Sequence, residues 1–452
     1  MPDLLLGQTL VFDADPFAEG PGAARHDAHG AVLIEGGHIA ALGPAEVLRP
    51  AHPGARVHDY GRALISAGFV DCHMHYPQTG IIASWGRRLI DWLDRYTFPE
   101  EMRLADPAHA RTIAALACDL AIDHGTTTFA SYCTTAAHSA DAIFEAAATR
   151  GLRIIAGRTC MDRNAPPGLV DTPERAAEET AALIARWHGR GRAGYAITPR
   201  FAPTSSPAQL AALGALWAAH PDCAMQTHLS EQTEEVAWVA ELFPAARDYL
   251  DVYAGAGLCG PGAVFGHAIH LTARERAHLA RSGAGVAHCP TSNTFIGSGL
   301  CDVAGLKADG IAVGLASDTG GGSSFSMLRT MAAAYEVGQL RGRALHPAEL
   351  WWLATGGSAE VLRLGDRVGR LAPGMEADVV VIDLDSTRAI AQRAARAETL
   401  WEALFPTIMM GDDRAVRAVW ADGRCLRARG VAPDQGAARP AAPPCPPTKE
   451  ER

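Results

Sequence analysis

Short apolar runs recur through the middle of the chain, and alanine-rich segments with helical spacing separate them. The runs are nearly continuous in apolar residues, as expected for strands buried on both faces of a parallel sheet. Eight runs are predicted as strands, at residues 68–75, 126–132, 153–157, 195–201, 224–229, 264–269, 285–288 and 311–317. Segments between them are predicted as helices, including residues 108–123, 139–150, 173–189 and 207–219.

This alternation of strands and helices predicts an α/β fold, a (β/α)8 barrel of the TIM type over residues 65–369. A doubly wound open sheet is the alternative architecture. Such sheets usually carry a glycine-rich phosphate turn after the first strand, and none is present after residue 75. The barrel is therefore the favoured prediction.

Both ends of the chain show another pattern, in which short β-type runs are separated by Gly and Asp turn residues. Asp422-Gly423 between two such runs predicts a hairpin. Neither end has enough strands to bury a core alone, so residues 1–64 and 370–430 are predicted to form one small β-sandwich domain. The Pro- and Ala-rich tail at residues 431–452 is predicted to be disordered.

Composition narrows the class of protein. A net charge of −10 argues against a general nucleic-acid binder. The N-terminus lacks the pattern of a secretory signal, and no apolar run approaches the roughly 20 residues that a membrane span needs. The ten cysteines lack paired C-x-x-C spacing, so buried reduced thiols are expected rather than zinc ligands. A soluble cytoplasmic protein without membrane or nucleic-acid partners is expected.

Metal-binding side chains follow the predicted strands. His73 and His75 are two residues apart at the end of a strand, so they point to the same side. Alone, this motif is as typical of core or surface histidines as of metal ligands. In a barrel, however, the carboxyl ends of all strands lie around one mouth. Further histidines and an aspartate follow later predicted strands and should lie at the same mouth. The candidates for this mouth are His73, His75, His228, His267 and Asp318.

Three imidazoles and a carboxylate around one divalent ion would leave a position for water, as in catalytic zinc sites. Glu231, three residues after His228, could shuttle protons there, or could simply favour the start of the next helix. His270 is a rival to His267 but should point elsewhere, and His288 could line the mouth or be structural. No lysine occurs between His75 and His228, which favours one metal over a lysine-bridged pair.

The motifs around these residues resemble those of the amidohydrolase superfamily over about residues 60–390, and more narrowly its guanine-deaminating branch. SAGFVDCHMHYPQ, GHAIHL, HCPTSN, GLASDTGGG and GMEADVVVID carry the broader resemblance. HYPQ, YTFPEE, TPRF and the ELFP segment carry the narrower one. Ala67 stands where the superfamily usually has proline, which affects only the approach to the first barrel strand.

The resemblance implies residue roles and a reaction. It implies His73, His75, His228 and Asp318 as metal ligands, Glu231 as proton shuttle, and His267 as the histidine that binds or orients the attacking water. It implies Gln78, Arg200 and Phe201 as purine-binding residues, beside His228, Glu231 and Asp318. The implied reaction is hydrolysis of guanine to xanthine and ammonia by attack at C2, with proton transfer by Asp318, His267 and Glu231.

The resemblance also implies one zinc ion per subunit and a homodimer, while iron or manganese would suit the same ligands. Two alternative functions stay open. A related amidohydrolase could act on another aminopurine, a pterin or a triazine with the same metal set. A non-enzymatic interaction protein would be expected to have lost that set. The segment at residues 76–103 could serve as a lid or as an interface.

Overall fold

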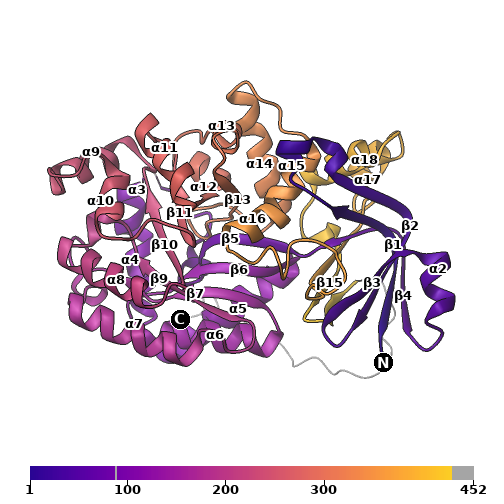
Figure 1. The fold of residues 1–452 in the computed structure, drawn as a ribbon, viewed down its shortest axis with the longest axis horizontal. Helices are drawn as coiled ribbons and strands as arrows, with labels where there is room; N and C mark the ends of the chain where they lie inside the picture. Colours follow the sequence, from indigo (N-terminus) through magenta and orange to yellow (C-terminus); the bar gives the residue numbers. More distant parts are fainter. Residues whose placement is uncertain (87–88, 430–452) are drawn as a thin grey trace, which may run out of the picture.

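The computed structural model describes residues 1–86 and 89–429, and it contains a parallel barrel (Figure 1). Neighbouring barrel strands are parallel, and their order follows the chain. The first and last strands also meet, because the Asp318 amide donates to the His73 carbonyl over 3.0 Å. The barrel strands are β5 (Phe69–His75), β6 (Thr126–Tyr132), β7 (Arg153–Gly157), β9 (Ala193–Pro199), β10 (Ala224–Leu229), β11 (Ala263–His267), β12 (Gly285–His288) and β13 (Ala312–Leu315). The barrel prediction is therefore confirmed against the open sheet.

Helices cover the outside of the barrel, and several begin where the sequence provides a cap. Asp106 accepts a hydrogen bond from the Ala108 amide, and Pro107 takes the first helical position, where no amide hydrogen is needed. Thr172 and Ser206 cap the predicted helices that begin at Pro173 and Pro207 in the same way. The outer helices are α5 (Pro107–Asp123), α6 (Ala137–Arg150), α7 (Pro173–Trp187), α8 (Pro207–Ala219), α9 (Thr233–Leu242), α10 (Tyr249–Gly255), α11 (Ala273–Ser282), α12 (Pro290–Phe295), α13 (Val303–Ala308) and α14 (Met327–Leu340).

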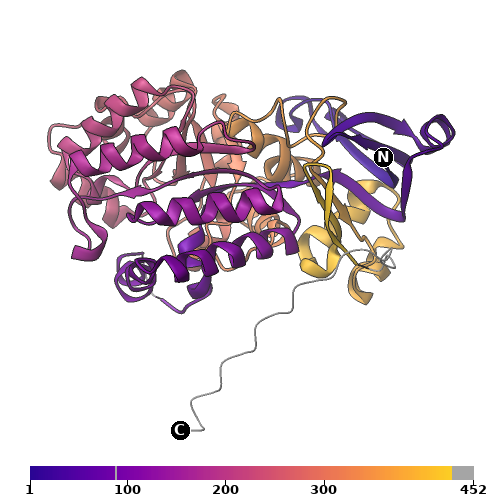
Figure 2. The same cartoon turned by 90° about the horizontal axis from the view of Figure 1, so that it is seen from below.

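The two ends of the chain form a second sheet beside the barrel, drawn in indigo and yellow at one end of the molecule (Figure 2). The C-terminal strand β14 (Val379–Ile382) pairs antiparallel with the N-terminal β4 (Arg56–Ala67), which joins the two ends. The remaining strands are β1 (Asp3–Phe12), β2 (Ala24–Glu35), β3 (His38–Pro44), β15 (Val416–Ala421) and β16 (Arg424–Ala428). Hydrogen bonds join all of them into one continuous seven-stranded mixed sheet, which confirms that the two chain ends form one separate β unit.

The predicted hairpin joins β15 and β16, and its turn residues Asp422 and Gly423 have φ of 52° and 69°. Positive φ at both central residues is what a type I′ turn requires. The N-terminal part of the sheet extends to Ala67 rather than to residue 64, because Ala67 still pairs with Val379. The predicted tail at residues 431–452 lies outside the described residues.

Two helices of the C-terminal part were not predicted, α17 (Arg388–Ala394) and α18 (Leu400–Met410). Pro406 lies inside α18, where proline usually breaks the helical pattern. Packing on the barrel compensates, since the rings of Phe405 and Tyr335 of α14 lie 4.9 Å apart. Short elements complete the fold: α1 (Pro16–Glu19), α2 (Ala45–Ala51), α3 (Leu89–Trp92), α4 (Phe98–Arg103), α15 (Pro347–Trp352), α16 (Ser358–Val361) and β8 (Thr159–Cys160).

A cluster of four charged side chains connects the second sheet to the barrel. Arg153 begins β7 and Arg192 directly precedes β9, so both lie at the amino ends of barrel strands. Both donate to Glu376, and Nη2 of Arg192 also lies 2.7 Å from Asp378. The cluster therefore lies at the end of the barrel opposite to the mouth.

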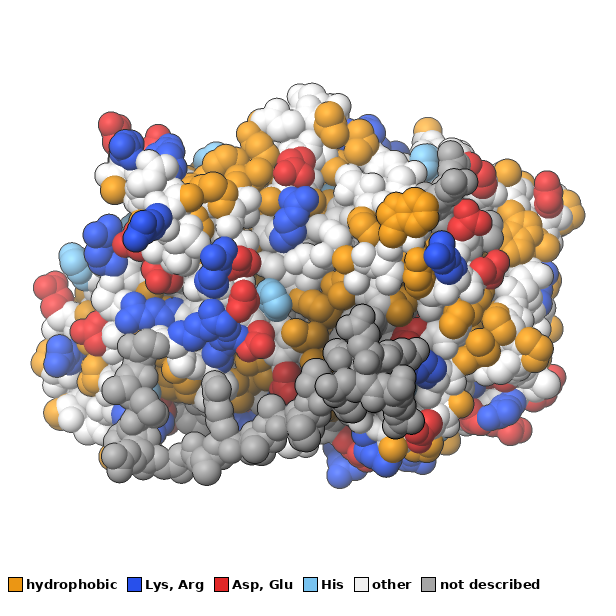
Figure 3. Space-filling view, turned by 180° about the vertical axis from the view of Figure 1, so that it is seen from behind, with side chains coloured by type: hydrophobic (Ala, Val, Ile, Leu, Met, Phe, Trp, Pro, Cys, Tyr) orange, Lys and Arg blue, Asp and Glu red, His pale blue; other side chains and the backbone are white. Residues whose placement is uncertain are grey.

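The molecular surface carries mixed charge on the face shown in Figure 3, where basic and acidic side chains are interspersed. Among the described residues, no helix combines the length and the apolar character needed to cross a lipid bilayer.

Candidate functional site

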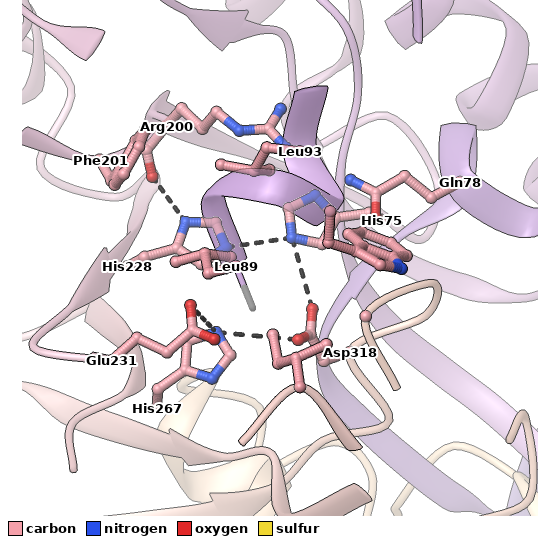
Figure 4. Close-up of a pocket in the computed structure, with 13 residues that line it drawn as sticks. His75, Gln78, Leu89, Leu93, Arg200, Phe201, His228, Glu231, His267 and Asp318 are labelled. Atoms are coloured by element: carbon pink, nitrogen blue, oxygen red, sulfur yellow. Dashed lines mark hydrogen bonds and ion pairs between the residues drawn. The ribbon is translucent and has the colours of Figure 1, made fainter. Parts of the chain in front are cut away.

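Four side chains with metal-binding atoms, those of His73, His75, His228 and Asp318, converge at the mouth of the barrel. Figure 4 shows His75, His228 and Asp318 of this group. Nε2 of His75 and Nε2 of His228 lie 3.1 Å apart, although the two residues come from β5 and β10. Oδ1 of Asp318 lies 3.3 Å from Nε2 of His73 and 3.5 Å from Nε2 of His75. All four side chains are almost completely enclosed by protein. Side chains from residues up to 245 positions apart in the sequence therefore surround one point. Their positions at the ends of strands had predicted this convergence.

The protonation and surroundings of these groups fit a divalent cation. Nδ1 of His228 donates to the Arg200 carbonyl over 2.6 Å, which directs the lone pair of Nε2 toward the shared point. Burial, reinforced by the neighbouring imidazoles, lowers the pKa of His228 well below its usual value, so the ring is neutral, as ligation requires. Nε2 of His73 is buried without a hydrogen-bond partner within the described part of the chain. A metal ion would satisfy it.

An aromatic ring supports the histidines from one side. Tyr132, at the end of β6, stacks on His75 with ring centroids 4.5 Å apart and an interplanar angle of 29°. Its ring also lies 4.8 Å from that of His228 and 4.9 Å from that of His73. Tyr132 was not singled out in the sequence, although it ends a predicted strand next to the one that carries His73 and His75.

A second group of titratable side chains lies beside the four. Nε2 of His267 is 3.4 Å from Oε2 of Glu231 and 3.7 Å from Oδ2 of Asp318. Its Nδ1 lies 2.8 Å from Oδ1 of Asn293, so Nδ1 carries the proton when the ring is neutral. Ser298 donates to Oε1 of Glu231 over 2.8 Å. Burial raises the pKa of Glu231 to about 7, a value suited to proton transfer near neutrality.

Unusual backbone conformations direct two of these side chains. His267 has φ of 68° and Asp318 has φ of 48°, in the left-handed region that residues other than glycine seldom adopt. Strand alternation would place His267 on the same face as Phe265, which packs in the layer between the barrel and its helices. The positive φ turns the imidazole into the mouth instead. Such conformations are concentrated at functional sites.

A pocket opens beside the four metal-binding side chains. Arg200 and Phe201 follow β9, and Gln78 lies in the turn after β5. Apolar side chains of the segment at residues 76–103 also line this pocket, namely Leu89, Trp92 and Leu93, of which Leu89 and Leu93 are labelled in Figure 4. These side chains therefore form part of the pocket wall. The full lining also includes His75, His228, Glu231, His267, Ile296, Asp318 and Gly321.

Two histidines considered in the sequence lie away from this group. Nε2 of His270 lies 2.8 Å from the Ser298 carbonyl, in hydrogen-bond geometry. His288 is fully buried but does not line the pocket, and neither of its ring nitrogens has a hydrogen-bond partner among the described residues. Of the two alternatives for His288, the structural one is favoured.

Four residues around the site were missed in the sequence: Glu101, Tyr132, Asn293 and Ser298. Glu101 and Asn293 belong to the family motifs YTFPEE and HCPTSN, and that membership is the one signal in the sequence that could have indicated them. Nothing near Ser298 distinguishes it from a loop serine.

Comparison with known proteins extends over most of the chain. A family model described as "Amidohydrolase family" matches residues 64–426, and one for an "Imidazolonepropionase-like composite domain, bacteria" matches residues 30–55. The guanine deaminase of Escherichia coli K12 is 41% identical over 408 residues, which cover 90% of this chain and 93% of that protein.

Solved structures are similar as well. The E. coli guanine deaminase structure has a TM-score of 0.93 at 40% identity and covers 95% of this chain and 100% of its own. A guanine deaminase from C. acetobutylicum with guanine bound in its active site has a TM-score of 0.85 at 27% identity. The match covers 94% of this chain and 100% of that one.

Proposed function

This chain belongs to the amidohydrolase family, and we propose that it is a hydrolase that deaminates guanine to xanthine and ammonia, a step of purine catabolism. The observation that carries the proposal is the site: three histidines and Asp318 converge next to a pocket lined by Gln78, Arg200 and Phe201. The identity of 41% to a guanine deaminase over 90% of the chain supports the same substrate.

The pocket side chains suit the base. The O6 and N7 atoms of guanine are both acceptors, and the guanidinium of Arg200 offers donors in a fixed fork. The Gln78 amide both donates and accepts, so it can contact O6 and N1–H. Phe201 supplies an apolar surface for the ring. Adenine has a donor at position 6 and would leave buried donors unpaired, which disfavours it by about 1–3 kcal/mol.

The metal that the family implies fits His73, His75, His228 and Asp318, and we propose a single zinc ion, although iron and manganese bind similar donors. When bound, such an ion supplies Lewis acidity and lowers the pKa of a coordinated water. The protein groups handle the protons. Asp318 and His267 accept the proton of the water that attacks C2, and Glu231 protonates N3. The proton taken up by Asp318 and His267 then passes to the 2-amino group, which leaves as ammonia, and Glu231 recovers a proton from the C2 hydroxyl as xanthine forms.

We also propose a cytoplasmic homodimer. The dimer is an expectation from the family resemblance, and sedimentation velocity would measure it. The cytoplasmic location is supported by the cysteines among the described residues, all of which are free thiols.

Ammonia release from guanine, adenine, cytosine, a pterin and a triazine tests the substrate, with metal analysis of the same preparation. Guanine should have the highest kcat/KM, and one equivalent of zinc should be present per chain. A higher kcat/KM for any other ring would overturn the substrate assignment. A preparation without transition metal and without deaminase activity would favour the non-enzymatic alternative.

A further inference from the structure

A buried carboxylate connects two of the side chains that would contact the base. Glu101 of α4 is 1% exposed, and both of its oxygens lie 2.8 Å from Nη1 of Arg200. Oε1 also accepts a hydrogen bond of 2.9 Å from Nε2 of Gln78. Glu101 itself does not line the pocket. It therefore lies behind the residues that face the substrate.

These contacts determine how Arg200 presents its donors. Glu101 engages only Nη1, which leaves Nε and Nη2 for acceptors other than Glu101. The carbon at the centre of the guanidinium also lies 5.6 Å from the ring centroid of Phe98, from the same helix as Glu101. Two contacts from α4 thus restrict the guanidinium plane. The charge of Arg200 is balanced behind the pocket, so the pocket can accept a neutral base.

The same carboxylate determines the orientation of the Gln78 amide. A carboxylate only accepts hydrogen bonds, so the group that Gln78 directs toward Glu101 has to be its NH2. The amide oxygen is correspondingly placed near the Gly320 amide, at 3.4 Å. With a neutral side chain in place of Glu101, only the longer contact with the Gly320 amide would oppose a turn of the Gln78 amide by 180°, which exchanges its donor and acceptor. The pattern that Gln78 presents to the substrate therefore depends on Glu101.

We propose that Glu101 is a positioning residue that makes the pocket selective for purines with an oxygen at position 6. It does so by holding the donors of Arg200 and the amide of Gln78 in one pattern. This inference rests on the proposed function, because it concerns the substrate of the same site. A site built around fixed hydrogen bonds rejects an analogue that cannot make them far more strongly than an apolar pocket does.

The test compares guanine with 2,6-diaminopurine, which keeps the 2-amino leaving group but has an amino group at position 6 and no N1–H. In Glu101→Gln, the amide can still accept from Arg200, but its NH2 would face Gln78 and favour the turned amide. We expect the kcat/KM for guanine to fall at least about 30-fold, mainly through KM, because one partner of a buried charged pair is removed. The ratio of kcat/KM for guanine to that for 2,6-diaminopurine should fall about 10-fold or more.

Glu100→Gln is a matched control. Glu100 is the neighbouring residue of α4, is 6% exposed, and pairs with Arg103 over 2.8 Å rather than with Arg200 or Gln78. It should leave the substrate ratio unchanged. Glu101→Asp keeps the carboxylate and should restore part of the ratio, and it also serves as the second variant if Glu101→Gln does not fold. Metal content and melting temperature are measured for every variant.

Two results would overturn the inference. One is an equal loss of kcat/KM for both purines in Glu101→Gln, as expected if Glu101 only anchors α4. The other is the same change of ratio in Glu100→Gln. Turnover of guanine by the unmodified protein is measured first and tests the proposed function alone. An active protein whose ratio does not respond to Glu101 would refute only the positioning role.

Discussion

The charged cluster between the barrel and the second sheet should stabilise the fold without affecting catalysis. Glu376 lies between Arg153 and Arg192, and its side chain is 13% exposed while theirs are 7% and 11% exposed. Nε of Arg153 and Nε of Arg192 both lie 2.9 Å from Oε2 of Glu376. With Asp378, the buried part of the cluster holds two positive and two negative charges, and the exposed Arg367 lies 4.0 Å from Oε1 of Glu376. Glu376→Gln removes one negative charge and leaves two largely buried guanidinium groups with one carboxylate.

The expected loss follows from that geometry. Removing one partner of a buried ion pair costs about 3–5 kcal/mol. Asp378 still pairs with Arg192, and the glutamine can still accept a hydrogen bond, so the lower limit, about 3 kcal/mol, is the better estimate. For a chain of this size, the melting temperature should fall by about 3 °C. Because the cluster lies at the amino ends of the barrel strands, kcat/KM should stay within about twofold of the unmodified value.

The loss should also depend on pH. Burial alone would raise the pKa of Glu376, but hydrogen bonds from Arg153 and the charges of both arginines outweigh burial, so its folded pKa lies below the unfolded value of 4.5. The carboxylate therefore contributes its full stability above pH 4.5 and loses it as the pH falls through the folded pKa. The difference in melting temperature between the two proteins should be largest at neutral pH and shrink below pH 4.5.

Thermal unfolding from pH 7 to pH 4, with kcat/KM at neutral pH, measures these effects. Glu241→Gln is the control, because Glu241 is exposed, and it should change stability by less than about 0.5 kcal/mol. An unchanged melting temperature in Glu376→Gln would refute the energetic argument. A loss that does not begin to shrink between pH 4.5 and pH 4 would show that the carboxylate charge is not its cause.

Three further predictions concern the site. A chelator should abolish turnover and lower the melting temperature. An ion that binds only the folded chain stabilises it by about 4 kcal/mol when its free concentration is a thousand times its Kd. An unchanged melting temperature would contradict a bound ion. Ser298→Ala should lower kcat by about 10-fold or more with little change in KM, because Glu231 loses a hydrogen bond of 2.8 Å. An effect confined to KM would instead assign Ser298 to substrate binding. Tyr132→Leu should weaken zinc affinity by about 10- to 100-fold, measured by competition with a chelating dye. Tyr132→Phe keeps the stacked ring and should retain the affinity. Equal losses in the two variants would assign the effect to the hydroxyl.

Much of the barrel could be predicted because its strands are encoded locally. The predicted strands at residues 126–132, 153–157, 224–229 and 285–288 agree with the structure at both ends. Their apolar runs are short and end in turn residues or helix caps, so the boundaries can be read from neighbouring positions. The helix α18 was missed for the opposite reason, since Pro406 disrupts its local pattern and contacts with α14 sustain the helix.

The candidate ligands were also visible in the sequence, because the carboxyl ends of parallel strands meet at one mouth whatever their separation along the chain. The orientation of individual side chains could not be predicted from the sequence. His267 points into the mouth only because its φ is positive, against the alternation of its strand. That conformation depends on the surrounding packing, and no feature of the residues 263–267 indicates it.

The sequence by itself determined the succession of strands and helices, the positions of metal-type side chains after strands, and the likeness to a family. Only the tertiary structure decided that the two chain ends share one continuous sheet through β4 and β14. Only the structure brought Glu101 against Arg200, 99 positions away. Local patterns encode burial and direction within a segment, whereas a buried ion pair depends on which segments pack together, and that choice is made by the energy of the whole fold.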